Sequence, residues 1–541
     1  MKKLYTFVLL SLFGWNAFSQ CTETQQPKIL LVGDSWAFFM GADQTINTIL
    51  NRWGHSNYTY YTNAIIAENG AETDDFLTQE KQDEIVLRLN ENPSIEVVHL
   101  SIGGNDVMGD WDVTFTPEET DSLKHAVAGR LLQVIDFIKS AKPGIRIVWS
   151  GYTYPNFEEV IESVAPFQSS HPFYGTWEGM GFPSFLQINT LLNEFSDSIA
   201  AFAAADPQLD FVNATGLMQY TFGQNTPLGV APGGTFPPQT APQPLGYPEY
   251  PSPRNSMRDY AITKDCFHLS AQGYRDLIDI QFRKFYHKFL MDDLYLLPEN
   301  NNQTGSVTAS GTVSQNISLG EETAAVLSFN TSSMPDTVIS KASIFLRRES
   351  VSGNNPISNS LNIKVKNGNF GLSAALEAED YAATGDVEGT ACQFGSNNNG
   401  HWIRLDLPAQ LLPHIKNDAS TQFIITAPGF TGGTAVFSGS ADPEFAPVLN
   451  LTYGTSNISV TETETVQRLR IFPNPVNTEF TLDTHLEGQL HIEIKNLMGQ
   501  TVFSTQTGNR QLNISHLSPA IYTVSVKATN GEFYSERLIK L

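Results

Sequence analysis

The chain has 541 residues, of which 41% are hydrophobic, so it is too long for a single core and is sized for about three domains. Its formal net charge of −24 argues against nucleic acid or an anionic membrane surface as a partner, because both bind basic patches. No segment reaches about 18 uninterrupted apolar residues, and we therefore expect a soluble protein.

The first residues have the pattern of a secretory signal peptide. Two lysines precede an apolar run at residues 4–13, and small residues before position 20 suit a cleavage site. We expect residues 1–19 to be removed, because the apolar run is too short to cross a membrane. Lipidation of Cys21 is a weaker alternative, since bulky Gln20 stands where a lipoprotein signal usually has a small residue.

Residues 27–292 alternate between strand and helix signals. Short apolar runs predict four strands, at 28–33, 95–102, 146–152 and 209–215. Helical periodicity marks 117–141, 183–205 and 271–291. This alternation predicts a parallel sheet with helices on both faces, where ligands bind at the carboxyl ends of the strands.

Two long stretches interrupt this alternation. Residues 153–182 are rich in aromatic residues and glycine, and they could form the wall of a substrate cleft. Residues 227–253 contain nine prolines and are either functional or a stiff surface excursion.

Ser35 follows the first predicted strand, within a Gly-Asp-Ser sequence. A serine is a weak nucleophile unless a base takes its proton and a third group orients that base. Asp265 and His268 precede the last predicted helix of this region, and their spacing lets one turn present both side chains on the same side. We expect Asp265 to hold the imidazole while His268 faces Ser35.

Donors for a developing oxyanion are also present. Gly70 lies in a turn, where the backbone N–H of a glycine can approach a ligand closely, and Asn105 follows a second core strand and can offer its amide.

Together these residues resemble the four motifs of the SGNH (GDSL-type) hydrolases. The motifs are Gly33-Asp34-Ser35, Gly70, Gly103-Gly104-Asn105-Asp106 and Asp265-x-x-His268. The resemblance covers residues 27–292 and implies a flavodoxin-like, three-layer α/β fold and ester hydrolysis through an acyl-enzyme. It implies that Ser35 is the nucleophile, His268 the base and Asp265 its orienter. The oxyanion hole would consist of the Ser35 and Gly70 backbone N–H groups and the Asn105 amide.

Other side chains near these motifs have two interpretations. Trp36 could narrow or wall the site, and Trp177 is as suited to packing as to stacking on a sugar. We expect Asp34 and Asp106 to have structural roles. We also expect His99 to be an interior residue.

Cysteine and metal-ligand patterns give little sign of further chemistry. Cys21, Cys266 and Cys392 are too few for a disulfide framework, and we expect Cys266 to be a small buried side chain. No spacing such as CxxC or HExxH appears. We expect no metal, no cofactor and no redox role.

After residue 298 the sequence pattern changes. The segment "ENNNQTGSVTASGT" reads as a linker, and residues 305–454 read as short strands with Gly, Asn and Ser turns, which predicts a β-sandwich. Segments such as "KASIFLRRES" and "SADPEFAPVLNL" resemble the DNRLRE-type sandwich of secreted proteins. Such a domain would act as a spacer or as a weak glycan binder.

A third unit, residues 468–541, follows the linker "TETETV". Its segments "RIFPNPVNTEFTL", "IEIKNLMGQTV" and "AIYTVSV" resemble the sorting domain of the type IX secretion system of Bacteroidetes. This resemblance implies another β-sandwich, export through the outer membrane by that machinery, and release or attachment at the cell surface. A plain accessory sandwich is the alternative.

The sequence therefore predicts a secreted serine esterase that removes acyl groups, in the first place acetyl, from polysaccharide. A lipase or lysophospholipase is the alternative within the enzyme class, with residues 153–182 supplying an apolar acyl groove. A surface adhesin that binds glycan without catalysis is the alternative from another class.

Overall fold

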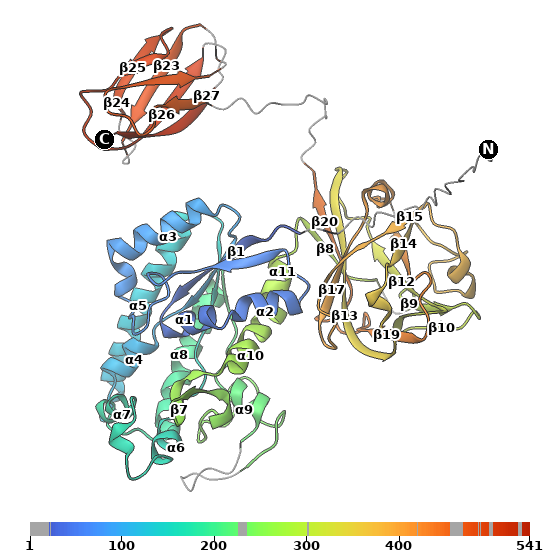
Figure 1. The fold of residues 1–541 in the computed structure, drawn as a ribbon. Helices are drawn as coiled ribbons and strands as arrows, with labels where there is room; N and C mark the ends of the chain where they lie inside the picture. The colour runs from blue at the N-terminus through green and yellow to red at the C-terminus, as the bar shows by residue number, and fades with distance from the viewer. Residues whose placement is uncertain are drawn as a thin grey trace, which may run out of the picture. The chain divides into compact units, whose positions relative to one another are not determined.

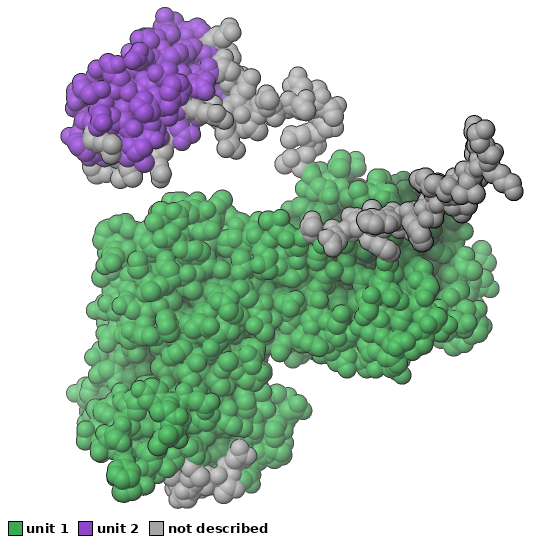
Figure 2. Space-filling view, in the orientation of Figure 1, with its two compact units in different colours: residues 1–456 green, residues 457–541 purple. Residues whose placement is uncertain are grey.

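The computed structural model describes residues 21, 23–224, 235–299, 302–418, 420–454, 469–484, 486, 488–496, 501–528 and 533–540. The expected signal peptide, part of the proline-rich stretch and the linker "TETETV" lie outside these residues. The chain forms two compact units, residues 1–456 and residues 457–541 (Figure 2).

The first unit begins with a parallel sheet, of which Figure 1 labels β1. Its strand order is β2-β1-β3-β4-β5. Its strands are β1 (Gln26–Gly33), β2 (Tyr58–Tyr61), β3 (Val97–Ser101), β4 (Arg146–Trp149) and β5 (Leu209–Phe211). The four predicted strands are all present, and the structure adds β2 at one edge. This strand escaped prediction because "YTYY" has no apolar run.

Helices cover both faces of this sheet, which confirms the predicted three-layer α/β fold. One face packs against α1 (Ser35–Ala42), α2 (Thr45–Arg52), α9 (Leu217–Phe222), α10 (Ala271–Gln281) and α11 (His287–Phe289). The other packs against α3 (Gln79–Glu91), α5 (Pro117–Ala141), α6 (Phe157–Glu162), α7 (Tyr174–Gly179) and α8 (Phe185–Ala205). Residues 29–32 of β1 enter these two cores alternately, so this part of the strand is a continuous apolar run.

Capping signals explain why two predicted helices begin where they do. Thr116 accepts a hydrogen bond from the backbone N–H of Glu119, whose carboxylate accepts from the Thr116 N–H, and proline follows at the first helical position of α5. Ser184 and Gln187 form the same capping box before α8. The predicted helix at 271–291 is instead divided by a π-helical turn, Phe282–Tyr286, between α10 and α11.

An antiparallel β-rich part follows, and it confirms the expected all-β texture. Its strands are β8 (Leu294–Leu296), β9 (Gly305–Thr308), β10 (Val313–Ser314), β11 (Ile317–Gly320), β12 (Thr323–Asn330), β13 (Ile339–Gly353), β14 (Asn362–Asn367), β15 (Val387–Thr390), β16 (Cys392–Gly395), β17 (Trp402–Asp406), β18 (Ser420–Thr426), β19 (Gly433–Phe437) and β20 (Val448–Tyr453). The long β13 pairs with β17 and β20 in one layer and with β19 in the other. The strand β9 occupies part of the segment that reads as a linker.

The β-rich part packs directly on the α/β part. Trp402 stacks on Trp53 with ring centroids 5.5 Å apart, and both indoles belong to one core together with Phe345 and Val448. Arg404 is buried and donates to the carbonyl of Gly54 at the end of α2. The two parts therefore share a hydrophobic core.

A disulfide joins Cys21 to Cys392 across 371 positions of sequence, with the two Cα atoms 5.6 Å apart. Three cysteines are too few for a disulfide framework, as expected, but two of them form this one bond, which was not predicted from the sequence. Spacing gives no sign of the pair, because only the docked β-rich part brings β16 to the N-terminal segment. Since the Cys21 sulfur is bonded, the lipidation alternative has no free thiol to use.

The second unit contains two antiparallel sheets around its own core. Its strands are β21 (Arg470–Phe472), β22 (Glu479–Asp483), β23 (Leu490–Lys495), β24 (Thr501–Thr507), β25 (Gln511–Asn513), β26 (Ala520–Ala528) and β27 (Phe533–Lys540). Across the described part of the chain, no helix combines the length and apolarity needed to cross a membrane.

Candidate active site

The turn between β1 and α1 places Ser35 at the first position of a helix. Gly33 has φ +150, and a Cβ there would lie 1.8 Å from the Ser101 carbonyl oxygen of β3, so only glycine fits. Asp34 caps α1 by accepting a hydrogen bond of 2.9 Å from the Trp36 N–H. The sequence at this turn is thus dictated by the close approach of β3 and by the need to start a helix.

Ser35, His268 and Asp265 meet at the carboxyl end of the sheet. The Ser35 Oγ lies 2.7 Å from His268 Nε2, and His268 Nδ1 lies 2.9 Å from an oxygen of Asp265. The other Asp265 oxygen accepts from the N–H groups of Phe267 and His268, at 2.7 Å each. The carboxylate is therefore fixed in place, and all three side chains of the Ser-His-Asp chain are buried.

This arrangement can activate the serine hydroxyl. With the proton of the imidazole on Nδ1, facing Asp265, the Nε2 lone pair faces Ser35 Oγ and can take its proton. His268 lies at the end of β7 (Thr263–Leu269), and Ser270 directly after it caps α10 by accepting from the Gly273 N–H at 3.1 Å. The strand-to-helix turn thus fixes the imidazole, as the placement of the sequence motif suggests.

The three predicted oxyanion donors lie in a turn, at Gly70, and in the first turns of two helices, α1 at Ser35 and α4 (Gly104–Asp110) at Asn105. The backbone N–H of Ser35 is in the first turn of α1, where helical N–H groups have no partner within the helix. Gly70 is exposed with φ +81, and nothing lies within 4 Å of a Cβ built there, so its conformation rather than space requires glycine. The Asn105 amide donates to the Ala71 carbonyl at 2.8 Å, which ties α4 to the segment after Gly70 and leaves a second amide hydrogen.

A buried polar network links these segments to the nucleophile turn. Tyr152 accepts from the Gly104 N–H at 2.9 Å and donates to the carboxylate of Asp34. Burial raises the pKa of Asp34 to about 6. Sequence reasoning missed Tyr152, because a single tyrosine at the end of a strand carries no motif.

Asp106 secures the loop that follows Gly70. Its carboxylate accepts from the backbone and side chain of Thr73 and, at 2.8 Å, from Arg130 of α5. Asp106 and Asp34 both bind loop backbone, which is the structural role expected for them.

The two tryptophans proposed for substrate contact lie in the interior instead. Trp36 is completely buried, with its ring centroid 4.9 Å from Tyr152 and 5.3 Å from Tyr274. Trp177 is also buried, and its indole N–H donates to the Pro183 carbonyl. Sequence position alone does not show whether a side chain lines a substrate site or packs in the core. Both indoles pack in the core here, and we therefore withdraw both residues as substrate contacts.

Phenylalanines surround the imidazole in their place. The ring of Phe39 lies 4.9 Å from that of His268, and Phe173 lies 5.9 Å away. Phe173 belongs to the stretch 153–182, so this stretch does reach the site.

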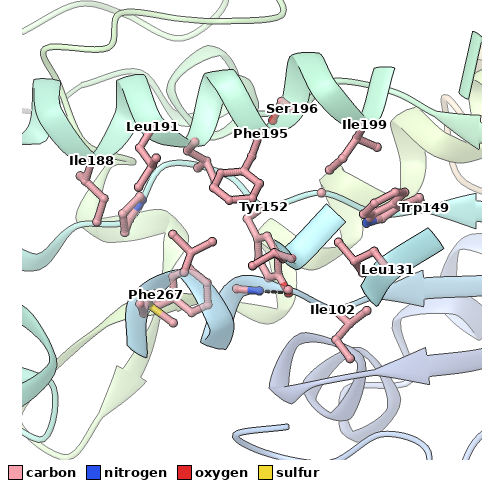
Figure 3. A pocket seen from close by; sticks show the side chains of 18 residues that line it. Ile102, Leu131, Trp149, Tyr152, Ile188, Leu191, Phe195, Ser196, Ile199 and Phe267 are labelled. Atoms are coloured by element: carbon pink, nitrogen blue, oxygen red, sulfur yellow. Dashed lines mark hydrogen bonds between the residues drawn. The ribbon is translucent and has the colours of Figure 1, made fainter. Parts of the chain in front are cut away.

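Behind Gly104 and Phe267 lies an apolar cavity of about 50 Å³, between the sheet and the helices α5 and α8 (Figure 3). The side chains labelled there are Ile102, Leu131, Trp149, Tyr152, Ile188, Leu191, Phe195, Ser196, Ile199 and Phe267. Their apolar character suits a small hydrocarbon group and no charged one.

His99 and Cys266 are interior residues, as expected from the sequence. His99 lies on β3 with its Nδ1 2.7 Å from the hydroxyl of Tyr286, and burial lowers its pKa to about 3. Cys266 is buried, and burial raises the pKa of its thiol. Among the residues that the structure describes, no group of three or more His, Cys, Asp or Glu side chains could hold a metal ion.

Comparison with known proteins identifies two regions. Residues 31–275 match the model of the GDSL-like lipase/acylhydrolase family, and residues 470–540 match that of the secretion system C-terminal sorting domain. No curated protein matches the chain. The chain thus carries a GDSL-like hydrolase domain and a type IX sorting domain, and it is a carboxylic ester hydrolase with a C-terminal export signal.

Three solved structures are similar to about half of this chain. The carbohydrate acetylesterase Est24 of Sinorhizobium meliloti is 14% identical, with 49% of this chain and 100% of that chain covered and a TM-score of 0.27. A family 3 carbohydrate esterase of Clostridium thermocellum is 17% identical over 49% and 99%, with a TM-score of 0.26. A GDSL-like lipase of Bacteroides thetaiotaomicron is 15% identical over 49% and 89%, with a TM-score of 0.26.

Proposed function

We propose that this ester hydrolase of the GDSL-like family removes acyl groups, in the first place acetyl, from polysaccharide outside the cell through an acyl-enzyme. One observation carries the proposal of the reaction: Ser35 Oγ, His268 and Asp265 form a continuous chain of hydrogen bonds of 2.7 and 2.9 Å. The type IX sorting domain directs the chain to the cell surface or the medium, where such polysaccharides occur.

In the first half of the reaction, Ser35 Oγ attacks the ester carbonyl carbon while His268 Nε2 takes its proton. The N–H groups of Ser35 and Gly70 and the amide of Asn105 stabilise the oxyanion. The intermediate then collapses, the sugar hydroxyl leaves with the proton from His268, and the acyl group remains on Ser35. Asp265 stabilises the imidazolium while it carries the proton.

In the second half, water attacks the acyl carbonyl and gives its proton to His268. Collapse of the second tetrahedral intermediate releases the carboxylic acid and returns the proton to Ser35 Oγ. Besides the ester and one water molecule, the two halves use only the chain's own residues.

The small cavity behind Gly104 supports a short acyl group. Its volume of about 50 Å³ is far below the range of about 300–1,000 Å³ that encloses a drug-sized ligand. A lipid esterase is the second candidate, favoured by Phe167 and Phe182, which are 70% and 44% exposed in the stretch 153–182.

The test is hydrolysis of p-nitrophenyl acetate and p-nitrophenyl palmitate by the wild type and by Ser35→Ala. We expect turnover of the acetate ester, an initial burst of nitrophenol equal to the enzyme concentration when deacylation is slow, and loss of turnover in the variant. Preference for the palmitate ester would favour the lipid esterase. Turnover that survives in Ser35→Ala would overturn the proposed reaction, and glycan binding without any ester turnover would favour an adhesin.

A further inference from the structure

We propose that a groove between α1, α2 and β2 binds the sugar part of the substrate, and that the sugar it binds is uncharged; this rests on the proposed function. The groove has a volume of about 470 Å³, within the range of ligand-binding clefts. Its lining residues are Phe38, Gly41, Ala42, Gln44, Asn47, Thr59, Tyr60, Tyr61, Thr62, Asn63, Ala64 and Ala67.

The groove begins next to the nucleophile. Phe38 lies one helical turn after Ser35 on α1, and Ala67 forms a bridge with Gly33 at the end of β1. Phe39 connects the groove to the base, because its ring lies 5.4 Å from that of Phe38 and 4.9 Å from that of His268. A ligand lying in the groove therefore has one end within reach of the Ser-His-Asp chain.

The lining contains no Asp, Glu, Lys, Arg or His, all twelve of its residues being described, although the chain as a whole carries a formal charge of −24. Charged groups beside the groove are paired: Asp43 with Arg258, and Glu84 with Arg88 at 2.6 Å. An anionic phospholipid head group or uronic acid would thus find no cation in the lining, whereas a neutral sugar needs none.

The lining also combines the two surfaces that a sugar ring presents. Phe38, which is 36% exposed, and the half-buried Tyr60 offer apolar surface to C–H groups. Threonine hydroxyls and the amides of Gln44 and Asn47 can exchange hydrogen bonds with hydroxyl groups.

These amides are held in fixed positions. Gln44 accepts from the Asn47 amide at 3.0 Å, and Asn47 in turn accepts from the Thr59 hydroxyl at 2.8 Å. Gln44 also has a left-handed backbone with φ 51, a conformation that costs free energy in any residue other than glycine. Strain of this kind tends to be retained at binding sites, where orienting a side chain in advance lowers the cost of binding.

The experiment compares two substrates in the full chain. For Phe38→Ala we expect about a tenfold loss of kcat/KM on acetylated xylo-oligosaccharides, mainly through KM, which corresponds to about 1.4 kcal/mol of lost binding. On p-nitrophenyl acetate, which has no sugar to bind, we expect a change below about twofold. Phe472→Ala, which removes an exposed phenylalanine in the second unit, should change neither.

Charge selection is tested with acetylated oligogalacturonides, which we expect to be poorer substrates than the neutral oligosaccharides. Equal losses on both substrates in Phe38→Ala, an unchanged KM on the oligosaccharides, or a preference for the oligogalacturonides would each overturn the proposal. Binding of unacetylated xylo-oligosaccharide to Ser35→Ala, measured by calorimetry with and without Phe38→Ala, does not need turnover. A result against sugar binding in the groove can thus be distinguished from a result against the proposed ester hydrolysis.

Discussion

The two ends of the parallel sheet are held together by different kinds of contact. At the carboxyl end, beside His268, buried polar groups join the loops: Asp34, Tyr152 and Asp106 all bind backbone or other polar side chains. At the amino end, where α11 lies beside the β-rich part (Figure 1), aromatic rings such as Trp53 and Trp402 form a shared core, and polar contacts such as Arg404 to the Gly54 carbonyl join the two parts. This unit therefore has its Ser-His-Asp chain at the carboxyl end of the sheet and the core shared with the β-rich part at the amino end. Changes at the first end should therefore affect turnover, and changes at the second should affect unfolding.

The largest effect is expected for Asp265→Asn. The asparagine oxygen can keep the two backbone hydrogen bonds, but its NH₂ would face His268 Nδ1 and favour the wrong imidazole tautomer. We expect kcat on p-nitrophenyl acetate to fall by about 10⁴-fold, with little change in the free energy of unfolding. Asp259→Asn, on the exposed hairpin before β7, is the control and should retain full turnover. Retained kcat in Asp265→Asn would remove Asp265 from the mechanism.

The next effect should be Trp402→Ala, which tests the amino end. Removing a fully buried indole from the shared core should lower the free energy of unfolding by about 3–5 kcal/mol, measured by urea denaturation. At 25 °C the kcat of the folded fraction should be unchanged, because the site lies at the other end of the sheet. Leu372→Ala, an exposed change in the β-rich part, should leave stability alone. A large fall in kcat with unchanged stability would contradict the division between the two ends.

A smaller effect is expected for Tyr152→Phe. The substitution removes the hydroxyl that accepts from the Gly104 N–H and donates to the Asp34 carboxylate. Because Gly104 directly precedes Asn105, the position of this oxyanion donor should be less well fixed. We expect kcat to fall about tenfold with KM nearly constant, and the free energy of unfolding to fall by about 1–3 kcal/mol. A loss of stability without any loss of kcat would show that the network only supports the fold.

The smallest effect concerns pH at the amino end. Burial lowers the pKa of His287 to about 3, and its Nδ1 lies 3.0 Å from the Nε2 of buried His55. The folded protein keeps His287 neutral while the unfolded chain gains a proton near pH 6.5, so its stabilising contribution is lost as pH falls from about 6.5 toward 3. By pH 5 this loss reaches at most about 2 kcal/mol.

The variant His287→Gln lacks this titration, and its free energy of unfolding should therefore decline less steeply than that of the wild type between pH 7 and pH 5. The comparison is made by urea denaturation at each pH. His125→Gln, a change of an exposed histidine on α5, is the control and should follow the wild-type slope. Equal slopes for His287→Gln and the wild type would contradict the expected titration.

Local signals predicted much of the catalytic half. The helix at 117–141 begins and ends as predicted, because a capping box and a proline mark its start. Ser35 and His268 meet across 233 positions because both end strands or precede helices at the same edge of the sheet. The sequence motifs and the strand order therefore both place the nucleophile and the base at this edge of the sheet.

Contacts between residues far apart in the chain could not be predicted from the sequence. Neither Trp53 nor Trp402 signals its partner, and the pairing of Cys21 with Cys392 follows only from the docked parts. Trp36 shows the same limit, since a large side chain beside a nucleophile can turn either toward the solvent or into the core. The groove at Phe38 likewise depends on β2, a strand without an apolar signature.

The disulfide also constrains the order of assembly. Cys21 stands near the beginning of the chain and Cys392 more than two thirds of the way along it. Synthesis is therefore well past the nucleophile, the base and most of the β-rich part before the second sulfur exists. The bond can close only in chains that extend past the nucleophile and the base to Cys392. A truncated chain that ends before Cys392 keeps a free thiol at Cys21, and this thiol therefore reports that the β-rich part is incomplete.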